Sequence, residues 1–515
     1  MATVQAIENP APHHPDRRGA VTILAKVFSF PVFMGAVLSA GAAAATVWNE
    51  APIMAGKLFG EGDTWWHLTY GQSILATHTW PRVEIYSFTA HGVSVIAYEW
   101  GGEVIMALAY RLGSLRGLAA LLVLLAISFV LLMFYYAWLR CRNPLAAAVA
   151  AAMLTPVASA CFTMRPQLLG YTFFLVTLIF LERYKQGLTK SLWLLPLLFL
   201  VWVNTHPSET LGLFALGLYW ACGLVSFKWG PLVAERFPAG RRRHLLLVSL
   251  ACAVVIMVTP YGPSLAAYPF EFILGRSYVT WAFTEWGPLD FSAPFGWMFL
   301  AIILLMLVSQ WSSPASFPIE AVILLLAGTA EASRHARFVI FFAVVSAPVL
   351  ASLLSKWLPT YRPDEDHPIA NAVLVGAVIL GLVAFFPSRL RLQQTLEDTF
   401  PVGAVDYIRQ HDSLNHMFND ETWGGFLMLS IGPTHQVFMD GRDEIYTYNG
   451  VIEDYIRIVQ AQPGALDLFR KYGINGCLIR RTAPLGKLLS GNPEWKQVYC
   501  DDLSVIFDRV EQRMK

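Results

Sequence analysis

Eleven apolar segments separated by polar loops constrain the fold of this chain more than any other feature of its sequence. A helix needs about 20 apolar residues to cross a bilayer, and most of the segments approach or reach that length. The predicted spans are Val21–Trp48, Leu115–Leu139, Leu145–Phe162, Leu168–Leu181, Ser191–Val203, Leu211–Phe227, Leu245–Val258, Phe295–Val308, Pro318–Ala330, Phe338–Leu354 and Ile369–Phe386. The sequence therefore predicts a mainly α, polytopic membrane helix bundle.

The composition agrees with a membrane location and excludes other classes. Hydrophobic residues make up 56% of the chain and charged residues 14%, with a mean hydropathy of +0.49, whereas soluble domains average roughly 25% charged residues. A net charge of +1 without a basic domain argues against nucleic-acid partners. The six cysteines show no CxxC and no Cys/His ligand spacing, so they give no metal-site signal.

The loops predict which side of the membrane each one faces. Lys and Arg collect in alternate loops, namely 140–142, 182–190, 228–244 and 356–362, and the short Ser/Pro loop near Ser312 falls on the same side in this alternation. Cytoplasmic loops carry such an excess of Lys and Arg. We therefore expect residues 1–20 to form a cytoplasmic tail followed by an uncleaved signal-anchor helix, residues 21–390 to form the membrane domain, and residues 395–515 to lie outside the cytoplasm. The alternative for the N-terminus is a cleaved signal peptide.

The first external loop, residues 49–114, is predicted to hold two helices that lie in the plane of the membrane. The segment Val93–Leu112 is fairly apolar but contains Glu99, Glu103 and Arg111. Counting it as a span would reverse every later loop, so we interpret it as an interfacial helix. Trp65–His78 is predicted to be another, with Trp65, Trp66, Leu68 and Ile74 as its apolar contacts.

The external loops contain acids, histidines and isolated arginines, which are costly near membrane depth and so tend to mark function or partnered structure. The candidates are Asp63, Trp65, Trp66, His67, Glu99, Glu103, Arg165, His206, Glu285, Arg334, His335 and Arg337. The structural alternatives are an interfacial aromatic belt with a capping Asp63, internal pairing of Glu331 with Arg334 or Arg337, hydrogen-bonded interfacial histidines, and Glu285 as a loop anchor.

From about Phe400 the chain changes character, and short β-type runs alternate with helical ones. Helices are expected at Val402–Gln410, Gly424–Ile431, Val451–Gln460 and Ala465–Tyr472, and strands at His416–Asn419, Gln436–Met439, Gly476–Ile479, Gln497–Tyr499 and Ser504–Phe507. This pattern predicts a small extracytoplasmic α/β domain. Cys477 and Cys500 could pair in an oxidising compartment or stay unpaired.

Taken together, the chain resembles the GT-C class of membrane glycosyltransferases. Members have a large first external loop with two interfacial helices and an early Asp or Glu, and many add an external C-terminal domain. The run Gly62–Leu68, with Ser87-Phe88-Thr89, Arg165-Pro166, Trp202-Val203-Asn204, Pro260-Tyr261-Gly262, Glu285-Trp286 and Asp440-Gly441-Arg442, is similar to a bacterial subgroup of such proteins. Asn419–Arg442 weakly resembles oligosaccharyltransferase catalytic subunits, but Thr422-Trp423-Gly424-Gly425 stands where those have a WWD motif.

The resemblance implies transfer of a sugar from a polyprenyl-phosphate donor to an external lipid, glycan or protein. It also implies that the protein is located in the bacterial inner membrane. Asp63 stands at the position of the catalytic acid and would act as the base of an inverting reaction, with Glu99 and Glu103 as further catalytic candidates. Arg165, Arg334 and Arg337 would bind the donor phosphate. A divalent cation, Mg or Mn, held by Asp63 with Glu99 or His67 is a further expectation.

Two other functions compete with the enzyme. A non-catalytic transporter or assembly factor of the cell envelope would show inverted repeats and broken helices at the membrane midplane. The two halves of the chain show no convincing repeat, and the acids lie at the ends of the predicted spans rather than at their centres. A sensor whose C-terminal domain binds an external ligand has no supporting motif. The sequence therefore favours the enzyme.

Overall fold

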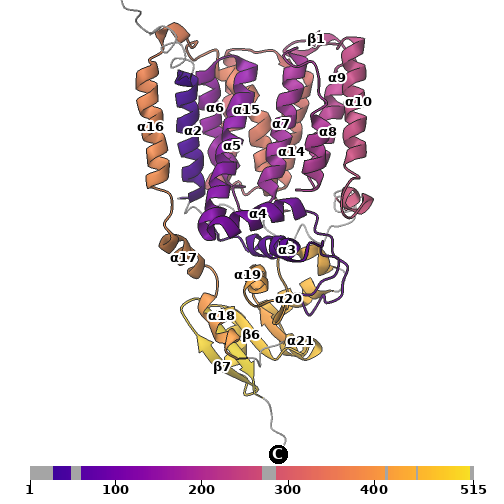
Figure 1. Cartoon of the computed structure of the whole chain (residues 1–515), viewed down its shortest axis with the longest axis vertical. Helices are drawn as coiled ribbons and strands as arrows, with labels where there is room; N and C mark the ends of the chain where they lie inside the picture. The colour runs from indigo at the N-terminus through magenta and orange to yellow at the C-terminus, as the bar shows by residue number, and fades with distance from the viewer. Residues whose placement is uncertain (1–26, 48–58, 269–285, 412–415, 448–449, 511–515) are drawn as a thin grey trace, which may run out of the picture.

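The structure, a computed structural model, describes residues 27–47, 59–268, 286–411, 416–447 and 450–510. Each of the eleven predicted apolar segments contains one helix of a bundle (Figure 1). These helices are α2 (Phe30–Val47), α5 (Leu115–Cys141), α6 (Pro144–Ser159), α7 (Gln167–Lys185), α8 (Leu195–Val203), α9 (Glu209–Cys222), α10 (Ala239–Val255), α13 (Pro294–Ser312), α14 (Ile319–Arg334), α15 (Val339–Leu354) and α16 (Pro368–Ala384).

Length and composition separate these helices into two groups. Among the described residues, four helical segments are long and apolar enough to cross a membrane: α2, α5, α13 and Ala336–Leu354. A fifth is added if α16 and the bent helix α17 (Arg389–Glu397) are one span. The fold class is thus confirmed as a multi-pass helix bundle, and the number of eleven crossings stays a prediction.

The five loops predicted to face the cytoplasm meet at one end of the bundle. Arg140 contacts Glu182 at 3.0 Å, and the Tyr184 hydroxyl donates to the Arg241 carbonyl at 2.9 Å. Strand β2 (Leu232–Ala234) pairs with β1 (Phe227–Trp229) and with β3 (Phe317–Pro318). Lys356 donates to the Ser313 carbonyl at 3.2 Å. The loops predicted to share one side of the membrane therefore share one end of the molecule.

The opposite end is crossed by α3 (Asp63–Thr77) and α4 (Trp100–Gly113), which lie roughly across the bundle axis (Figure 1). The second helix begins later than predicted, because Val93 and Ser94 pair with residues 83–84 instead: the Glu84 amide donates to the Val93 carbonyl at 2.8 Å. The two helices cross closely at Gly71, where a Cβ atom would collide with the Glu103 backbone. This contact fixes their relative position.

One expectation for these helices is wrong. Trp65, Trp66, Leu68 and Ile74 were predicted to contact the membrane interface, but all four are buried within the protein. The indole of Trp65 packs edge-on against Phe400 at a centroid distance of 5.5 Å. The apolar side of α3 is covered by the C-terminal domain, so it is not available to lipid.

The C-terminal domain confirms the predicted α/β pattern. Its five-stranded sheet has the order β5-β4-β6-β8-β7, in which β4 is parallel to both of its neighbours and β8 is antiparallel to both of its own. The strands are β4 (His416–Asn419), β5 (Gln436–Val437), β6 (Gly476–Arg480), β7 (Trp495–Cys500) and β8 (Ser504–Arg509). The helices are α18 (Val402–Arg409), α19 (Glu421–Ile431), α20 (Val451–Val459), α21 (Ala465–Lys471) and α22 (Pro484–Ser490). Cys477 and Cys500 are both free.

The domain and the first loop form one packed unit. Residues Tyr86–Phe88 extend the edge of the sheet: the Val437 amide donates to the Tyr86 carbonyl at 2.8 Å, and the Phe88 amide donates to the Val437 carbonyl at 3.1 Å. On the other side, α19 lies so close to α3 that a Cβ at Gly425 would meet the Gly62 carbonyl oxygen. The start of α3 is therefore held between the bundle and the C-terminal domain.

Candidate active site

Asp63 is the first residue of α3 and lies where the bundle, the first loop and the C-terminal domain meet. Its Oδ2 is 2.6 Å from Nη2 of Arg165, a residue of the loop that connects α6 and α7. The same guanidinium also pairs with Glu61. Because the N-terminus of a helix carries a partial positive charge, a carboxylate is favoured at this position. The side chain of Asp63 keeps 19% of its surface exposed.

A chain of buried polar side chains runs beneath α3. Glu103 Oε1 lies 3.2 Å from His67 Nδ1, and His67 Nε2 lies 3.2 Å from Glu99 Oε2. The other oxygen of Glu99 lies 3.3 Å from His206 Nε2. His206 Nδ1 in turn is 2.9 Å from the Ser208 hydroxyl. This chain joins α3, α4 and the loop after α8 through side-chain contacts.

Burial determines the protonation of this chain. Desolvation raises the pKa of Glu99 to about 8, against the opposing effect of the nearby Arg165 and Arg337 guanidiniums. Burial, with the neighbouring Glu99, raises the pKa of Glu103 well above its usual value. Burial and the same two arginines lower the pKa of His206 to about 3, and the pKa of His67 also falls. Burial therefore favours the neutral form of each carboxyl and imidazole group in this chain.

Arg337 lies near the same buried groups as Arg165, since both act electrostatically on Glu99 and on His206. Its Cζ stands 4.0 Å from the ring centroid of Trp286. Such stacking on an indole orients a guanidinium. The site thus combines one carboxylate with two arginines from loops far apart in the sequence.

The C-terminal domain contributes acids to the same region. Burial raises the pKa of Glu421 to about 8, and the negative charge of Asp63 is the next cause. Burial, Glu421 and Asp63 together raise the pKa of Asp443 well above its usual value. Burial also raises the pKa of Glu444. Glu421 and Asp443 lie close enough to Asp63 to feel its charge, and burial favours their protonated forms, which limits the negative charge beside Asp63.

A buried ion cluster fixes these acids in place. Arg442 forms an ion pair with Asp440 of its own domain at 2.6 Å and another with Glu84 of the first loop. It also donates a hydrogen bond to the Tyr70 hydroxyl of α3. Burial alone would raise the pKa of Asp440, but the guanidinium outweighs it and holds that pKa below its usual value. The motif Asp440-Gly441-Arg442 therefore links the domain to the first loop.

The remaining predicted site residues are placed differently. Trp65 is 1% exposed and serves as core packing, whereas the buried indole nitrogen of Trp66 lies close to Gly441 and has no hydrogen-bond partner among the described residues. His335 Nδ1 is 2.7 Å from the Trp286 carbonyl, and so it holds the two segments together. Arg334 is exposed, and no ion pair joins it to Glu331 in the described part of the chain. Glu285 lies outside the described residues.

The described residues do not gather a divalent-cation site. No group of three or more His, Cys, Asp or Glu side chains within the described ranges is arranged to hold a metal ion. Glu99 and His67 contact each other, and Asp63 contacts Arg165. The Mg or Mn ion stays a prediction, and no step below depends on it.

Several residues of the site had no role in the sequence-based prediction: Glu61, Glu84, Glu421, Arg442, Asp443 and Glu444. The density of charge in Asp440–Glu444, interrupted by a glycine and enclosed by apolar runs, is the signal that could have revealed most of them.

No family model matches the sequence, and no curated protein matches it. Solved structures do match. The oligosaccharyltransferase of Archaeoglobus fulgidus in its apo form aligns with a TM-score of 0.55 at 12% identity, covering 90% of this chain and 70% of that one. The same protein tethered to an acceptor peptide with an NVT sequon gives 0.52 at 13% identity, covering 90% and 69%. The chain has a GT-C fold.

A second GT-C protein agrees. The arabinofuranosyltransferase AftD from mycobacteria aligns with a TM-score of 0.51 at 13% identity, covering 95% of this chain and 41% of that one. The GT-C likeness extends over the helix bundle and the C-terminal domain together, because at least 90% of the chain is covered in each alignment. At these identities the likeness establishes the fold and leaves the reaction to be argued from the site.

Proposed function

We propose that the chain is a membrane glycosyltransferase that moves a sugar from a polyprenyl-phosphate donor to an acceptor on the side of the C-terminal domain, with Asp63 as the base. The observation that carries the proposal is the carboxylate of Asp63 paired with Arg165 at the junction of the three parts of a GT-C fold. The GT-C proteins it matches include an oligosaccharyltransferase and an arabinofuranosyltransferase.

In the proposed reaction the acceptor hydroxyl attacks the anomeric carbon of the sugar while Asp63 takes its proton. The bond between the anomeric carbon and the phosphate oxygen breaks, and the phosphate leaves with the electron pair. This single displacement inverts the configuration at the sugar. A carboxylate is sufficient as the base because the acceptor proton moves only as the new bond forms.

Arg165 and Arg337 would stabilise the charge of the departing phosphate. A guanidinium carries five N–H donors, so Arg165 can contact Asp63 and a phosphate together. Trp66 would contribute its indole N–H, which has no partner within the described ranges and lies beside Gly441 and the Asp63 carboxylate. Glu99, Glu103, His67 and His206 act as positioning residues in this proposal, since they contact one another beneath α3.

Asp63→Asn tests the proposal, because it keeps the size of the side chain and removes its basicity. Loss of a general base typically slows a reaction by roughly 10²–10⁴-fold. The measurement is mass spectrometry of polyprenyl-phosphate sugars in lipid extracts from cells that lack the protein, that express it, or that express Asp63→Asn. Wild type should deplete one sugar-lipid species and Asp63→Asn should not, at equal protein levels. Depletion by both proteins at similar rates would remove Asp63 from the mechanism.

A reconstitution experiment distinguishes a transferase from a transporter. A transporter of the lipid or of a polysaccharide would change the distribution of a species between leaflets without cleaving its sugar. Wild-type protein reconstituted with polyprenyl-phosphate sugars and an envelope extract that supplies acceptor hydroxyls should release the sugar-free polyprenyl phosphate if it is a transferase. Movement of the intact sugar-lipid without cleavage would favour transport.

A further inference from the structure

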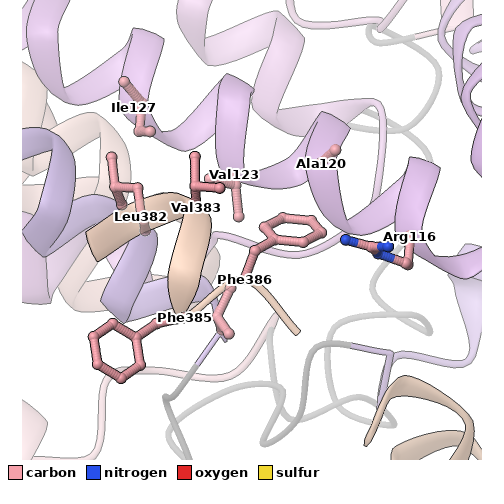
Figure 2. Close-up of a pocket in the computed structure, with 10 residues that line it drawn as sticks. Arg116, Ala120, Val123, Ile127, Leu382, Val383, Phe385 and Phe386 are labelled. Carbon is pink, nitrogen blue, oxygen red and sulfur yellow. The ribbon is translucent and has the colours of Figure 1, made fainter. Parts of the chain in front are cut away.

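Helix α16 leaves a gap at the edge of the bundle. It packs against α2, and it stands at the outside of the molecule (Figure 1). Between α16, α2 and α5 lies a cavity of about 360 Å³, within the range of about 300–1,000 Å³ that ligand pockets occupy. Figure 2 shows how Val123, Leu382 and Phe386 converge on it. Ala43 of α2 and Ala120 of α5 form the small-residue part of the wall.

One charged side chain lines this otherwise apolar cavity. Arg116 is the second residue of α5 and is exposed, and its guanidinium lies 5.6 Å from the ring centroid of Phe386 (Figure 2). Within the described ranges, no carboxylate forms an ion pair with it. Because α5 is long and apolar enough to cross the membrane, its second residue stands near the membrane surface. A guanidinium at that depth attracts an anion, and phosphate oxygens match its geometry.

We propose that this groove binds an anionic phospholipid of the bilayer, with an acyl chain against the apolar walls and the headgroup phosphate on Arg116. The reacting donor phosphate is a poor fit for this position. The start of α5 packs against α4 at Ala109, where a Cβ on Gly117 would meet the Ala109 carbonyl oxygen, and Ala109 stands six residues after Glu103 of the chain beneath Asp63. At 1.5 Å per residue that separation is about 9 Å along α4, and the arginines that act electrostatically on this chain are Arg165, Arg337 and Arg442. Arg116 therefore stands apart from the residues that surround Asp63.

The position of the groove gives the lipid a structural effect. Helix α16 continues into α17 through a bend of 54°, and α17 packs against α5 before the chain enters the C-terminal domain. A lipid between α16 and α5 would fill the gap that α16 leaves. It would also contact both helices that flank the bend, because α17 packs against α5. The bound state should therefore be more resistant to unfolding, since a ligand that binds only the folded state stabilises it.

The test uses the full-length protein in detergent with two phospholipids, phosphatidylglycerol and phosphatidylcholine. Native mass spectrometry counts the bound lipid, and thermal unfolding gives the stabilisation. Phosphatidylglycerol should bind wild type and raise its Tm more than phosphatidylcholine does. Arg116→Gln should weaken phosphatidylglycerol binding about fivefold and remove the difference in Tm. Arg111→Gln, an exposed arginine in the last turn of α4, is the matched control and should behave as wild type.

Two further measurements make the outcome decisive. Ala120→Trp should fill the groove and reduce binding of both phospholipids, and its own Tm without lipid reports whether it folds. Undecaprenyl phosphate is the second probe: it should not displace phosphatidylglycerol from wild type at equal concentration. Equal phosphatidylglycerol binding by wild type and Arg116→Gln would overturn the proposal. So would displacement by undecaprenyl phosphate that depends on Arg116, because the groove would then belong to the donor.

Discussion

A Cβ atom on Gly441 would occupy the space that a carboxylate oxygen of Asp63 fills, with the indole nitrogen of Trp66 also within 3.6 Å of it. The glycine comes from the C-terminal domain and the aspartate from the first loop, so the two parts of the molecule meet at the proposed base. The C-terminal domain therefore forms a wall of the site, and the shape of that wall depends on the lack of a Cβ atom at Gly441.

Gly441→Ala is expected to displace Asp63 and lower transfer strongly while the protein still folds. A misplacement of about 1 Å can cost roughly 10²-fold in rate. The control is Gly491→Ala in the same domain, where the nearest atom to an added Cβ lies at an ordinary 3.6 Å. Depletion of the polyprenyl-phosphate sugar is measured for both variants. Full activity of Gly441→Ala would show that the position of Asp63 is not critical.

Arg442→Met should destabilise the protein, because it leaves the carboxylates of Asp440 and Glu84 buried without their cation. Breaking such a buried pair typically costs about 3–5 kcal/mol. Arg409→Met is the control, since Arg409 forms an exposed pair with Asp406 at 3.0 Å, a kind worth about 1 kcal/mol or less. Thermal unfolding compares the two variants. Equal Tm values for both would mean that Arg442 does not hold the domain to the first loop.

The raised pKa of Glu99 predicts how stability depends on pH. The folded protein keeps this proton up to about pH 8, whereas the unfolded chain releases it near 4.5. Between those values the folded state binds more protons, so the free energy of unfolding falls as pH rises, by about 1.4 kcal/mol per pH unit for one group. Below about 6.5 the lowered pKa values of His67 and His206 produce the opposite slope.

The window from about pH 6.5 to 8 therefore isolates the carboxylic acids. Glu99→Gln, which cannot titrate, should lose part of the downward slope of wild type in this window. The measurement is the Tm of both proteins at several pH values between these limits. Curves that run parallel would mean that Glu99 does not hold its proton in the folded state.

Much of the architecture could be predicted because it follows from local patterns. The apolar segments identify their helices, and the loop charges identify which loops share an end of the bundle. In the C-terminal domain, β4 has the predicted bounds, and α20 ends one residue earlier than expected. Each of these patterns is complete within a few residues of the chain, so no tertiary contact is needed to read it.

The site could be predicted only in part, because it depends on contacts between distant segments. The sequence singled out Asp63 and Arg165 but gave no means to join them across 102 positions, and it left the C-terminal domain without a role. Trp65 was interpreted as a membrane contact because a sequence cannot distinguish lipid from a domain that arrives more than 300 residues later, as Phe400 does. The start of α4 was predicted wrongly for a similar reason, because Val93 instead accepts a hydrogen bond from the Glu84 amide.

Arg337→Lys is expected to weaken donor binding without unfolding the protein. The guanidinium of Arg337 stacks on Trp286 and acts electrostatically on Glu99 and His206, as Arg165 also does, so both arginines lie near the same buried groups. Lysine keeps the charge but loses both the planar stack and the two-pronged contact with phosphate. Arg334→Lys is the matched control, because Arg334 is only three residues away, at the end of α14, and is exposed.

Binding of a polyprenyl phosphate to the purified variants, with their Tm values, distinguishes the two arginines. Arg337→Lys should bind the lipid more weakly than wild type at an unchanged Tm, and Arg334→Lys should match wild type in both. If Arg337 serves only to hold the segment around Trp286, the outcome reverses: Tm falls and the affinity of the folded protein stays constant. Weaker binding by Arg334→Lys than by Arg337→Lys would instead move the donor phosphate to the exposed end of α14.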